Sequence, residues 1–562
     1  MVERDIHHEH VDSPTEESSL LDSESDVTGD SYGSTRNLLV VKTASGISDE
    51  ESQGQAANKR THNVVRIISV LLIGILVAHA DGSIMLATSA TIASEFNELA
   101  NAAWLVTSFA LAGAASQTLY GKLSDIYGRR LIVIVAYLFV VLGCVIVGIG
   151  QTMWQVILGR VISGAGTSGM TALVSVLITD LLPLRDVAPW RAYVNVVATT
   201  GRSVGGPLGG WLADVVGWRW SFLGQAPILG IAIILCAIYL PGPPPHAHGE
   251  SNSAKFSRID FRGSFVFAAM ILSLLLPIEL GGSQFPWTHP LIIGLFTLSG
   301  VLLAVFIVVE RREKEPILPL EIFHRRDAVL SFLIMGFQTA AQISMMFSVP
   351  LYFQVTGGLS NTESGLHLVP AVVGNAIGGL LSGIIIKRTG KYKFLTLLAV
   401  TFSSASYLLL MTRWHGNTAW PESLYIIPSG FGTGIAQSAL FISLQVVIDP
   451  AHLAPAVSFM YLSTTVWMTI GLPVSNAVMG VSLRRTLEAR LVGLGLGRPE
   501  ILQILSDAIS DVSYVHRITG PVHTAIVDSY VDGLWWSHGV SFTFSFSALI
   551  MALFLKQRQL DT

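Results

Sequence analysis

The chain has 562 residues, of which 51% are hydrophobic and only 13% are charged, and its formal net charge is −4. Soluble domains average about 25% charged residues, so this composition excludes an ordinary soluble protein and indicates one that crosses a membrane many times. The two cysteines, Cys144 and Cys236, lie inside apolar runs and predict neither a disulfide framework nor a thiolate metal site.

Residues 1–62 are acidic and rich in serine, and they lack hydrophobic periodicity, so we predict a disordered tail. Within this tail, "EESSLL" carries Glu16, Leu20 and Leu21. The pattern resembles the acidic dileucine signal that sorting adaptors read on cytosolic tails. A chance match explains so short a pattern equally well.

Fourteen apolar runs follow, each of a length and composition that predicts a membrane-crossing helix. Their approximate limits are 66–90, 103–121, 131–150, 154–178, 191–213, 220–240, 263–282, 290–310, 328–352, 365–386, 394–411, 423–447, 456–481 and 539–556. Lysine and arginine gather in the loops after the even-numbered runs, for example at Lys122, Arg258 and Lys393. Basic residues favour the cytosolic side, so we predict that these loops and both termini are cytosolic.

The loop near 482–538 is long, and it falls on the opposite, lumenal or exterior side. Its stretch "ILQILSDAISDVSYVHRI" spaces apolar residues at helical intervals. Two placements remain open for this stretch: on the membrane surface, or over the outer mouth of the protein.

The loop after the second run reads "GKLSDIYGRR" and combines small residues with charges. Glycine lets two helices approach closely and permits backbone conformations that other residues resist. The ordered set is Gly121, Asp125, Gly128, Arg129 and Arg130. It resembles the loop signature of the major facilitator superfamily, except that Ile126 stands where a basic residue is common. The resemblance implies a charge-paired latch at a cytosolic gate.

The fourth and fifth runs carry two more motifs of that superfamily. In "ILGRVISGAGTSG", Arg160 lies within an apolar run, where an arginine is costly and usually faces a cavity or a partner; the alternative is a side chain that reaches outward to the interface. "NVVATTGRSVGGPLGGWLAD" resembles the antiporter signature of drug:proton exchangers. Its motif residues are Gly201, Arg202, Gly205, Gly206, Pro207, Gly209 and Gly210.

Ionisable residues inside the apolar runs are candidates for binding protons and substrate. Asp81, in the first run, matches the acidic position of this branch's first-helix motif. A buried carboxyl that holds either a proton or a cationic substrate, but not both, gives a simple basis for antiport. The alternative is a structural ion pair with Arg160 or Arg202. Glu279 and Asn195 are further candidates, with an interfacial role and a packing hydrogen bond as their alternatives.

These features predict an all-α polytopic protein with the major facilitator fold and 14 transmembrane helices, in two six-helix halves with two extra central helices. The expected parts are a tail at 1–62, an N-terminal half at 63–240, a linker with two helices at 241–310 and a C-terminal half at 311–562. Within the superfamily, the chain is most similar to fungal vacuolar basic amino-acid transporters of the fourteen-span drug:proton antiporter branch.

The resemblance implies a proton-coupled antiporter that moves basic amino acids from the cytosol into the vacuole. The alternatives are a plasma-membrane multidrug exporter and a nutrient receptor that transports nothing. The sequence lacks a Gly-x-x-x-x-Gly-Lys-Ser/Thr phosphate loop and a His-Glu-x-x-His metal helix, so we expect neither an enzyme nor a cofactor or metal. The expected partners are protons, cationic amino acids or drugs, the lipid bilayer and a sorting adaptor, without nucleic acid.

Overall fold

The computed structural model describes residues 34–98, 101–242, 252–282, 284–510 and 512–560. The chain divides into two units, Met1–His62 and Asn63–Thr562. In the first unit, residues 34–62 are helical as part of α1 (Ser34–Glu95), although composition predicts no ordered structure there. The predicted sorting residues Glu16, Leu20 and Leu21 lie outside the described residues.

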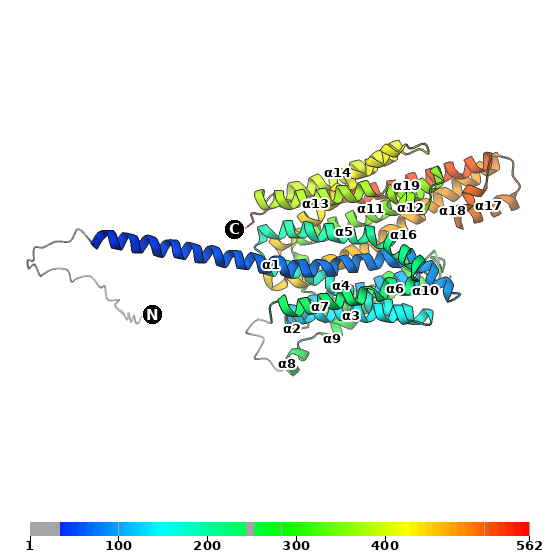
Figure 1. The fold of residues 1–562 in the computed structure, drawn as a ribbon. Coiled ribbons are helices and arrows are strands. Elements are labelled where there is room, and N and C mark those ends of the chain that lie inside the picture. The colour runs from blue at the N-terminus through cyan, green and yellow to red at the C-terminus, as the bar shows by residue number, and fades with distance from the viewer. Residues whose placement is uncertain (1–33, 99–100, 243–251, 283, 511, 561–562) are drawn as a thin grey trace, which may run out of the picture. The chain divides into compact units, whose positions relative to one another are not determined.

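In the second unit, the chain up to residue 240 forms long helices joined by short turns, as its apolar runs predict (Figure 1). After the apolar part of α1, Val64–Glu95, these helices are α2 (Trp104–Tyr127), α3 (Arg129–Ile149), α4 (Met153–Leu181), α5 (Leu184–Val215), α6 (Trp218–Leu223) and α7 (Gln225–Tyr239). α2 and α3 both pack on α4, and α7 packs on α3.

The central segment contains α8 (Asn252–Ser257), α9 (Phe261–Leu280) and α10 (Pro290–Glu310). α9 begins where the Asp260 side chain accepts a hydrogen bond from the Gly263 backbone N–H at 2.7 Å, and α10 begins at a proline, which fits the first turn of a helix. α9 packs on α10 and also contacts α2 and α16. Of the two central helices, α9 therefore packs beside a helix from each of the other two parts of the chain, and α10 packs on α9.

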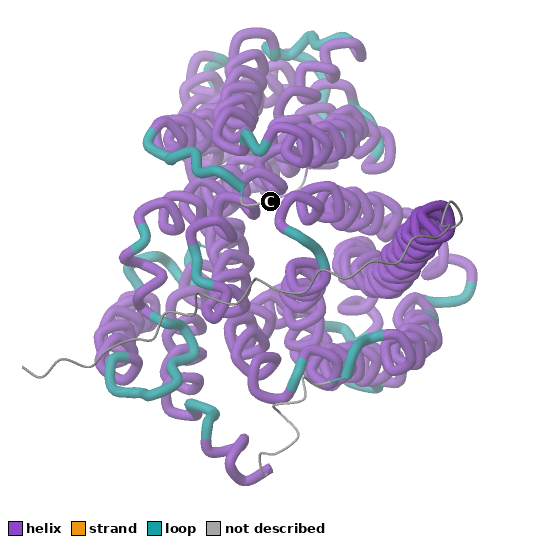
Figure 2. Tube along the Cα trace, turned by 90° about the vertical axis from the view of Figure 1, so that its left-hand side faces the viewer, coloured by secondary structure: helices purple, strands orange, loops and turns teal. Residues whose placement is uncertain are grey.

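The remaining helices make up the C-terminal part. They are η3 (Leu320–His324), α11 (Arg326–Gly357), α12 (Asn361–Leu366), α13 (Val369–Thr389), α14 (Tyr392–Arg413), η4 (Trp420–Ile426), α15 (Ile427–Val447), η5 (Pro450–His452), α16 (Leu453–Gly493), α17 (Arg498–Ser510), α18 (Val512–Arg517) and α19 (Pro521–Leu553). α13 and α14 pack on α15, and α11 packs on α16 and α19. Figure 2 views the bundle along its helices; the described residues form helices and loops without a strand.

Within the described residues, 12 helical segments are long and apolar enough to cross a membrane. α2 and α5 are long enough but are not among them; α2 carries several serines and glycines, and α5 carries Arg191 and Arg202. Both nevertheless pack among the twelve, α2 on α4 and α5 on α13. The count of fourteen spans stays a prediction, as does the division at residues 240 and 310.

Charged residues form ion pairs at both ends of the bundle. Residues 121–130, 182–186, 387–391 and 556–558 lie at one end, which we call the motif end. There, Lys387 Nζ lies 2.7 Å from Asp186 Oδ1, and the Gln557 side chain donates to the Gly390 carbonyl at 2.8 Å. At the opposite end, Arg219 pairs with Glu95 at 2.7 Å. That the motif end is cytosolic stays a prediction.

The loop predicted near 482–538 is shorter in the structure, because α16 continues to Gly493 and α19 already begins at Pro521. Leu483, Leu487 and Leu491 recur every four residues, so one face of α16 stays apolar beyond the hydrophobic run. These leucines form a separate cluster with α17, α18 and the start of α19. The helical spacing recognised in this stretch corresponds to α17 and α18.

Candidate functional site

A buried ion pair between α1 and α4 forms the centre of the candidate site. Asp81 Oδ2 lies 2.6 Å from Arg160 Nη1, and each side chain is 1% exposed. Arg160 Nε also donates to the Leu105 carbonyl of α2 at 3.1 Å, and the guanidinium lies 4.2 Å from the centroid of the Phe109 ring. Gln225 of α7 donates to Asp81 Oδ1 at 3.4 Å. Four helices thus meet at one pair of opposite charges.

Three glycines of the antiporter motif hold α5 against α1 beside Asp81. A Cβ atom at Gly201 would lie 2.6 Å from the Leu76 carbonyl oxygen, and one at Gly205 would lie 2.5 Å from that of Ala80. Gly209 similarly lies against Ile84. A Cβ atom at Gly206 would make only an ordinary van der Waals contact, and one at Gly210 would have no atom within 4 Å. These two motif glycines are therefore not needed for the close packing of α5 on α1. The exposed Arg202 stays apart from Asp81, whose cation is Arg160.

The other two predicted ligands lie elsewhere. Glu279 of α9 accepts a hydrogen bond from Thr107 of α2 at 3.5 Å. Thr107 follows Leu105 by two residues in α2. The Asn195 side chain of α5 donates to Asn375 Oδ1 of α13 at 2.7 Å, and Asn375 also bonds Thr433. Asn195 is thus part of a polar contact between the two halves, and its role in binding substrate stays a prediction.

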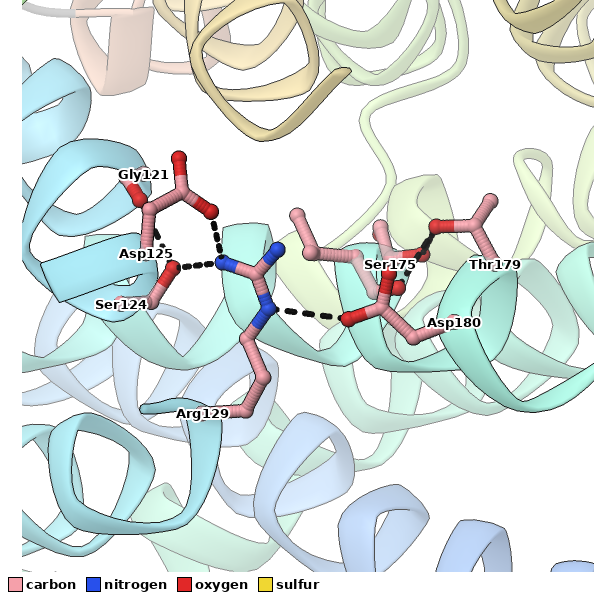
Figure 3. A network of polar contacts seen from close by, with 8 residues as sticks. Gly121, Ser124, Asp125, Arg129, Ser175, Thr179 and Asp180 are labelled. Atoms are coloured by element: carbon pink, nitrogen blue, oxygen red, sulfur yellow. Dashed lines mark hydrogen bonds and ion pairs between the residues drawn. The ribbon is translucent and has the colours of Figure 1, made fainter. Parts of the chain in front are cut away.

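At the motif end, Arg129 holds two carboxylates together (Figure 3). Its Nη1 donates to Asp125 Oδ1 at 2.5 Å, and its Nε donates to Asp180 Oδ2 of α4 at 2.9 Å. Gly128 turns the chain between α2 and α3 with φ +89°, a conformation that favours glycine. Arg130 donates instead to the Ala237 carbonyl of α7. The loop signature therefore fastens α2, α4 and α7 to one another.

Three residues were not predicted from the sequence: Arg191, which joins the two halves, and Asp180 and Gln225, which join helices within the N-terminal half. Arg191 of α5 donates to Tyr461 Oη of α16 at 2.8 Å and lies over the Phe441 ring of α15, 4.1 Å from its centroid. An arginine at the start of a predicted span was a visible signal for this contact. Asp180 and Gln225 gave no comparable signal, because a polar residue near a helix end is common.

A third charge cluster ties the central helices to the loop signature. Glu315, between α10 and α11, binds Lys122 of α2 at 2.9 Å and Arg258, which precedes α9, at 2.9 Å. Burial raises the pKa of the Glu315 carboxyl, but the hydrogen bonds and charges of Lys122 and Arg258 outweigh burial and hold this pKa below its usual value. Glu315 is therefore favoured in its charged form.

This lowered pKa predicts a specific acid response. A carboxylate with a depressed folded-state pKa stabilises the protein above the ordinary carboxyl range and loses that contribution as pH falls through the lowered value. We expect Glu315→Gln to lower stability by up to about 1 kcal/mol at neutral pH, because the cluster is partly exposed. The difference from wild type should vanish in acid, as measured by thermal unfolding. Glu313→Gln is the matched control, and a difference that persists in acid would contradict the assignment.

Comparisons with known proteins agree with this architecture. The family model of the Major Facilitator Superfamily matches residues 70–472. The chain is 30% identical over 527 residues to the vacuolar membrane amino acid uptake transporter fnx2 of Schizosaccharomyces pombe, covering 92% of this chain and 89% of that protein. It is 26% identical over 458 residues to vacuolar basic amino acid transporter 2 of Saccharomyces cerevisiae, covering 80% and 96%.

Among solved structures, the proton:xylose symporter XylE has the same fold, with a TM-score of 0.58 at 14% identity over 89% of this chain and 98% of that chain. The predicted all-α major facilitator fold is thereby confirmed. A family match over most of the chain, a relative of similar length and a shared fold lead to one assignment. The chain belongs to the Major Facilitator Superfamily.

Proposed function

We propose that this transporter is a proton-coupled antiporter that moves basic amino acids from the cytosol into the vacuole. Its superfamily consists of membrane transporters for small molecules, not enzymes. The observation that carries the proposal is the Asp81–Arg160 pair, two opposite charges that are each 1% exposed. The printed names of two relatives, a vacuolar amino acid uptake transporter and a vacuolar basic amino acid transporter, support the substrate class and the membrane.

The pair offers two charges that match the head group of an amino acid. A substrate ammonium group fits Asp81, and a substrate carboxylate fits the planar guanidinium of Arg160. A buried charge that loses its partner is strongly destabilising, so Asp81 has to be neutralised by Arg160, by a substrate cation or by a proton. Because one carboxylate serves these occupants in turn, proton and substrate exclude each other. Mutual exclusion at one site couples their movement in opposite directions.

Contacts between the halves close the motif end in this conformation. A Cβ atom at Gly121 of α2 would lie 2.9 Å from the Ala454 carbonyl of α16, and one at Gly383 of α13 would lie 2.8 Å from the Pro189 Cα of α5. The Asp186–Lys387 pair adds a charge contact between the same two helices, α5 and α13. Transport requires these contacts to break when the motif end opens, which makes them part of the proposed gate.

Uptake by isolated vacuoles tests the proposal. Upon acidification of the lumen, vacuoles that contain the protein should take up labelled lysine, arginine or histidine, and Asp81→Asn should abolish this uptake. Asp214→Asn, which removes an exposed carboxylate on α5, is the matched control and should transport normally. Uptake that survives collapse of the pH gradient would refute proton coupling. Drug efflux at the plasma membrane, or binding without flux in proteoliposomes, would instead favour the exporter or the receptor.

A further inference from the structure

Two buried carboxyl groups meet at the motif end of the central helices, far along the chain from Asp81. Asp260 directly precedes α9, and Glu310 is the last residue of α10. α9 and α10 pack on each other, and the chain reverses direction between them. Asp260 is 6% exposed and Glu310 is 3% exposed. Acidic side chains are almost never this buried unless they are paired, so their surroundings require an explanation.

Each carboxyl group uses only one of its two oxygens. Asp260 Oδ1 accepts the hydrogen bond from the Gly263 N–H that begins α9, at 2.7 Å. Glu310 Oε1 accepts a hydrogen bond from the Leu318 N–H at 2.6 Å. The other oxygens, Asp260 Oδ2 and Glu310 Oε2, are buried and have no hydrogen-bond partner among the described residues. Buried polar atoms in this state are uncommon and point to a missing partner.

The two partnerless oxygens lie around the same point. A Cβ atom built on Gly263 would stand 2.0 Å from Asp260 Oδ2 and 3.1 Å from Glu310 Oε2. Any side chain at position 263 would therefore enter the space between the two carboxyl groups. Glycine leaves this space free, so both oxygens lie close to the same unfilled space.

The basic residues nearby do not neutralise the pair. Arg258 and Lys122 bind Glu315 instead. The other charged groups on the segments that pack here are Lys255 and Arg262 beside α9 and Arg311, Arg312, Glu313 and Lys314 after α10. Among the described residues, no ion pair joins any of these cations to Asp260 or Glu310. Two ionised carboxylates would thus repel each other here without a compensating cation among the described residues.

We propose that Asp260 and Glu310 form a proton-binding site that holds one proton between Oδ2 and Oε2. Two carboxyl groups at close range cannot both ionise easily, and one shared proton creates a carboxyl–carboxylate hydrogen bond that satisfies both partnerless oxygens. A metal ion fits poorly, because Ca²⁺ takes six to eight oxygen ligands and Mg²⁺ prefers an octahedron. The described residues contain no group of three or more metal-ligating side chains.

This site connects the local proton concentration to the loop signature. Glu310 fixes the backbone at Leu318, and between these two residues lies Glu315, which binds Lys122 and Arg258. Loss of the shared proton leaves two repelling charges, which push the Glu310 side chain away from Asp260 and disturb the segment that leads to Glu315. The central helices then become less firmly attached to α2. This inference goes beyond the proposed function and does not depend on Asp81.

Infrared difference spectroscopy on the purified full-length protein tests the site. We expect the C=O band of a protonated carboxyl group to disappear from the wild-type spectrum as pH rises above the ordinary carboxyl range. Glu310→Gln and Asp260→Asn should each remove this band. Asp81→Asn and the matched control Glu313→Gln should keep it, which separates this site from the proposed transport site. A wild-type spectrum without the band, or a band that both site variants retain, would overturn the proposal.

Thermal unfolding as a function of pH gives a second readout. The folded protein holds a proton that the unfolded chain has released, so stability should fall as pH rises above the ordinary carboxyl range. Glu310→Gln should flatten this dependence, because its amide can donate to Asp260 without titrating. Asp260→Asn places asparagine, which also caps helices well, before α9. If Glu310→Gln does not fold, the pH dependence of this second variant tests the shared proton. A slope that both variants share with wild type would contradict the shared proton.

Discussion

Removing either charge of the Asp81–Arg160 pair should destabilise the protein by about 3–5 kcal/mol, whereas removing both should restore most of the lost stability. Asp81→Asn leaves an arginine that cannot release its proton, and Arg160→Gln leaves a carboxylate whose remaining described contact is Gln225 at 3.4 Å. The double variant Asp81→Asn/Arg160→Gln leaves two neutral amides that can bond each other. Denaturant unfolding of the purified protein measures all three.

Transport should not recover together with stability. The proposed mechanism needs an ionisable carboxyl group at position 81, so the stable double variant should remain without proton-driven uptake. Arg219→Gln is the control, because it breaks a partly exposed pair with Glu95 at 2.7 Å and should cost no more than about 1 kcal/mol. A double variant whose loss of stability equals the sum of the two single losses would show that the two charges act independently, and one that transports normally would remove Asp81 from the mechanism.

The positions of the helices could largely be predicted from the sequence, because an apolar run in lipid has to satisfy its own backbone and therefore forms a helix. The run predicted at 290–310 coincides with α10. The prediction failed where helices leave the apolar layer. α16 runs on to Gly493 and α19 begins at Pro521, since amphipathic turns continue a helix without raising its hydropathy.

The candidate site could be predicted only as separate residues. Asp81 and Arg160 are conspicuous because charges are rare in apolar runs, but their pairing depends on how α1 and α4 face each other, which one sequence does not state. Nothing in the sequence indicated that Asp260 and Glu310 lie together. Both stand at helix ends, where an acidic residue usually meets solvent, and only the packing of α9 on α10 buries them.

Gly121→Val should open the motif end and reduce transport. A Cβ atom at this position would lie 2.7 Å from Ser458 Oγ and 2.9 Å from the Ala454 carbonyl oxygen, and the backbone of α16 cannot turn away as a side chain can. Overpacking of this kind costs about 1–3 kcal/mol. The cost applies only to the conformation in which α2 and α16 touch. The substitution should therefore favour conformations in which these two helices are apart, and each 1.4 kcal/mol of cost changes the ratio of the two populations roughly tenfold.

Spin labels at the exposed positions Arg185 and Arg388 would report this shift, because they stand beside Asp186 of α5 and Lys387 of α13. The label pair should show a longer distance in Gly121→Val than in wild type. Gly210→Val makes the same chemical change where no atom lies within 4 Å of the new Cβ, so it should leave the distance unchanged. An unchanged distance in Gly121→Val, together with normal uptake, would mean that the contact between α2 and α16 does not control the gate.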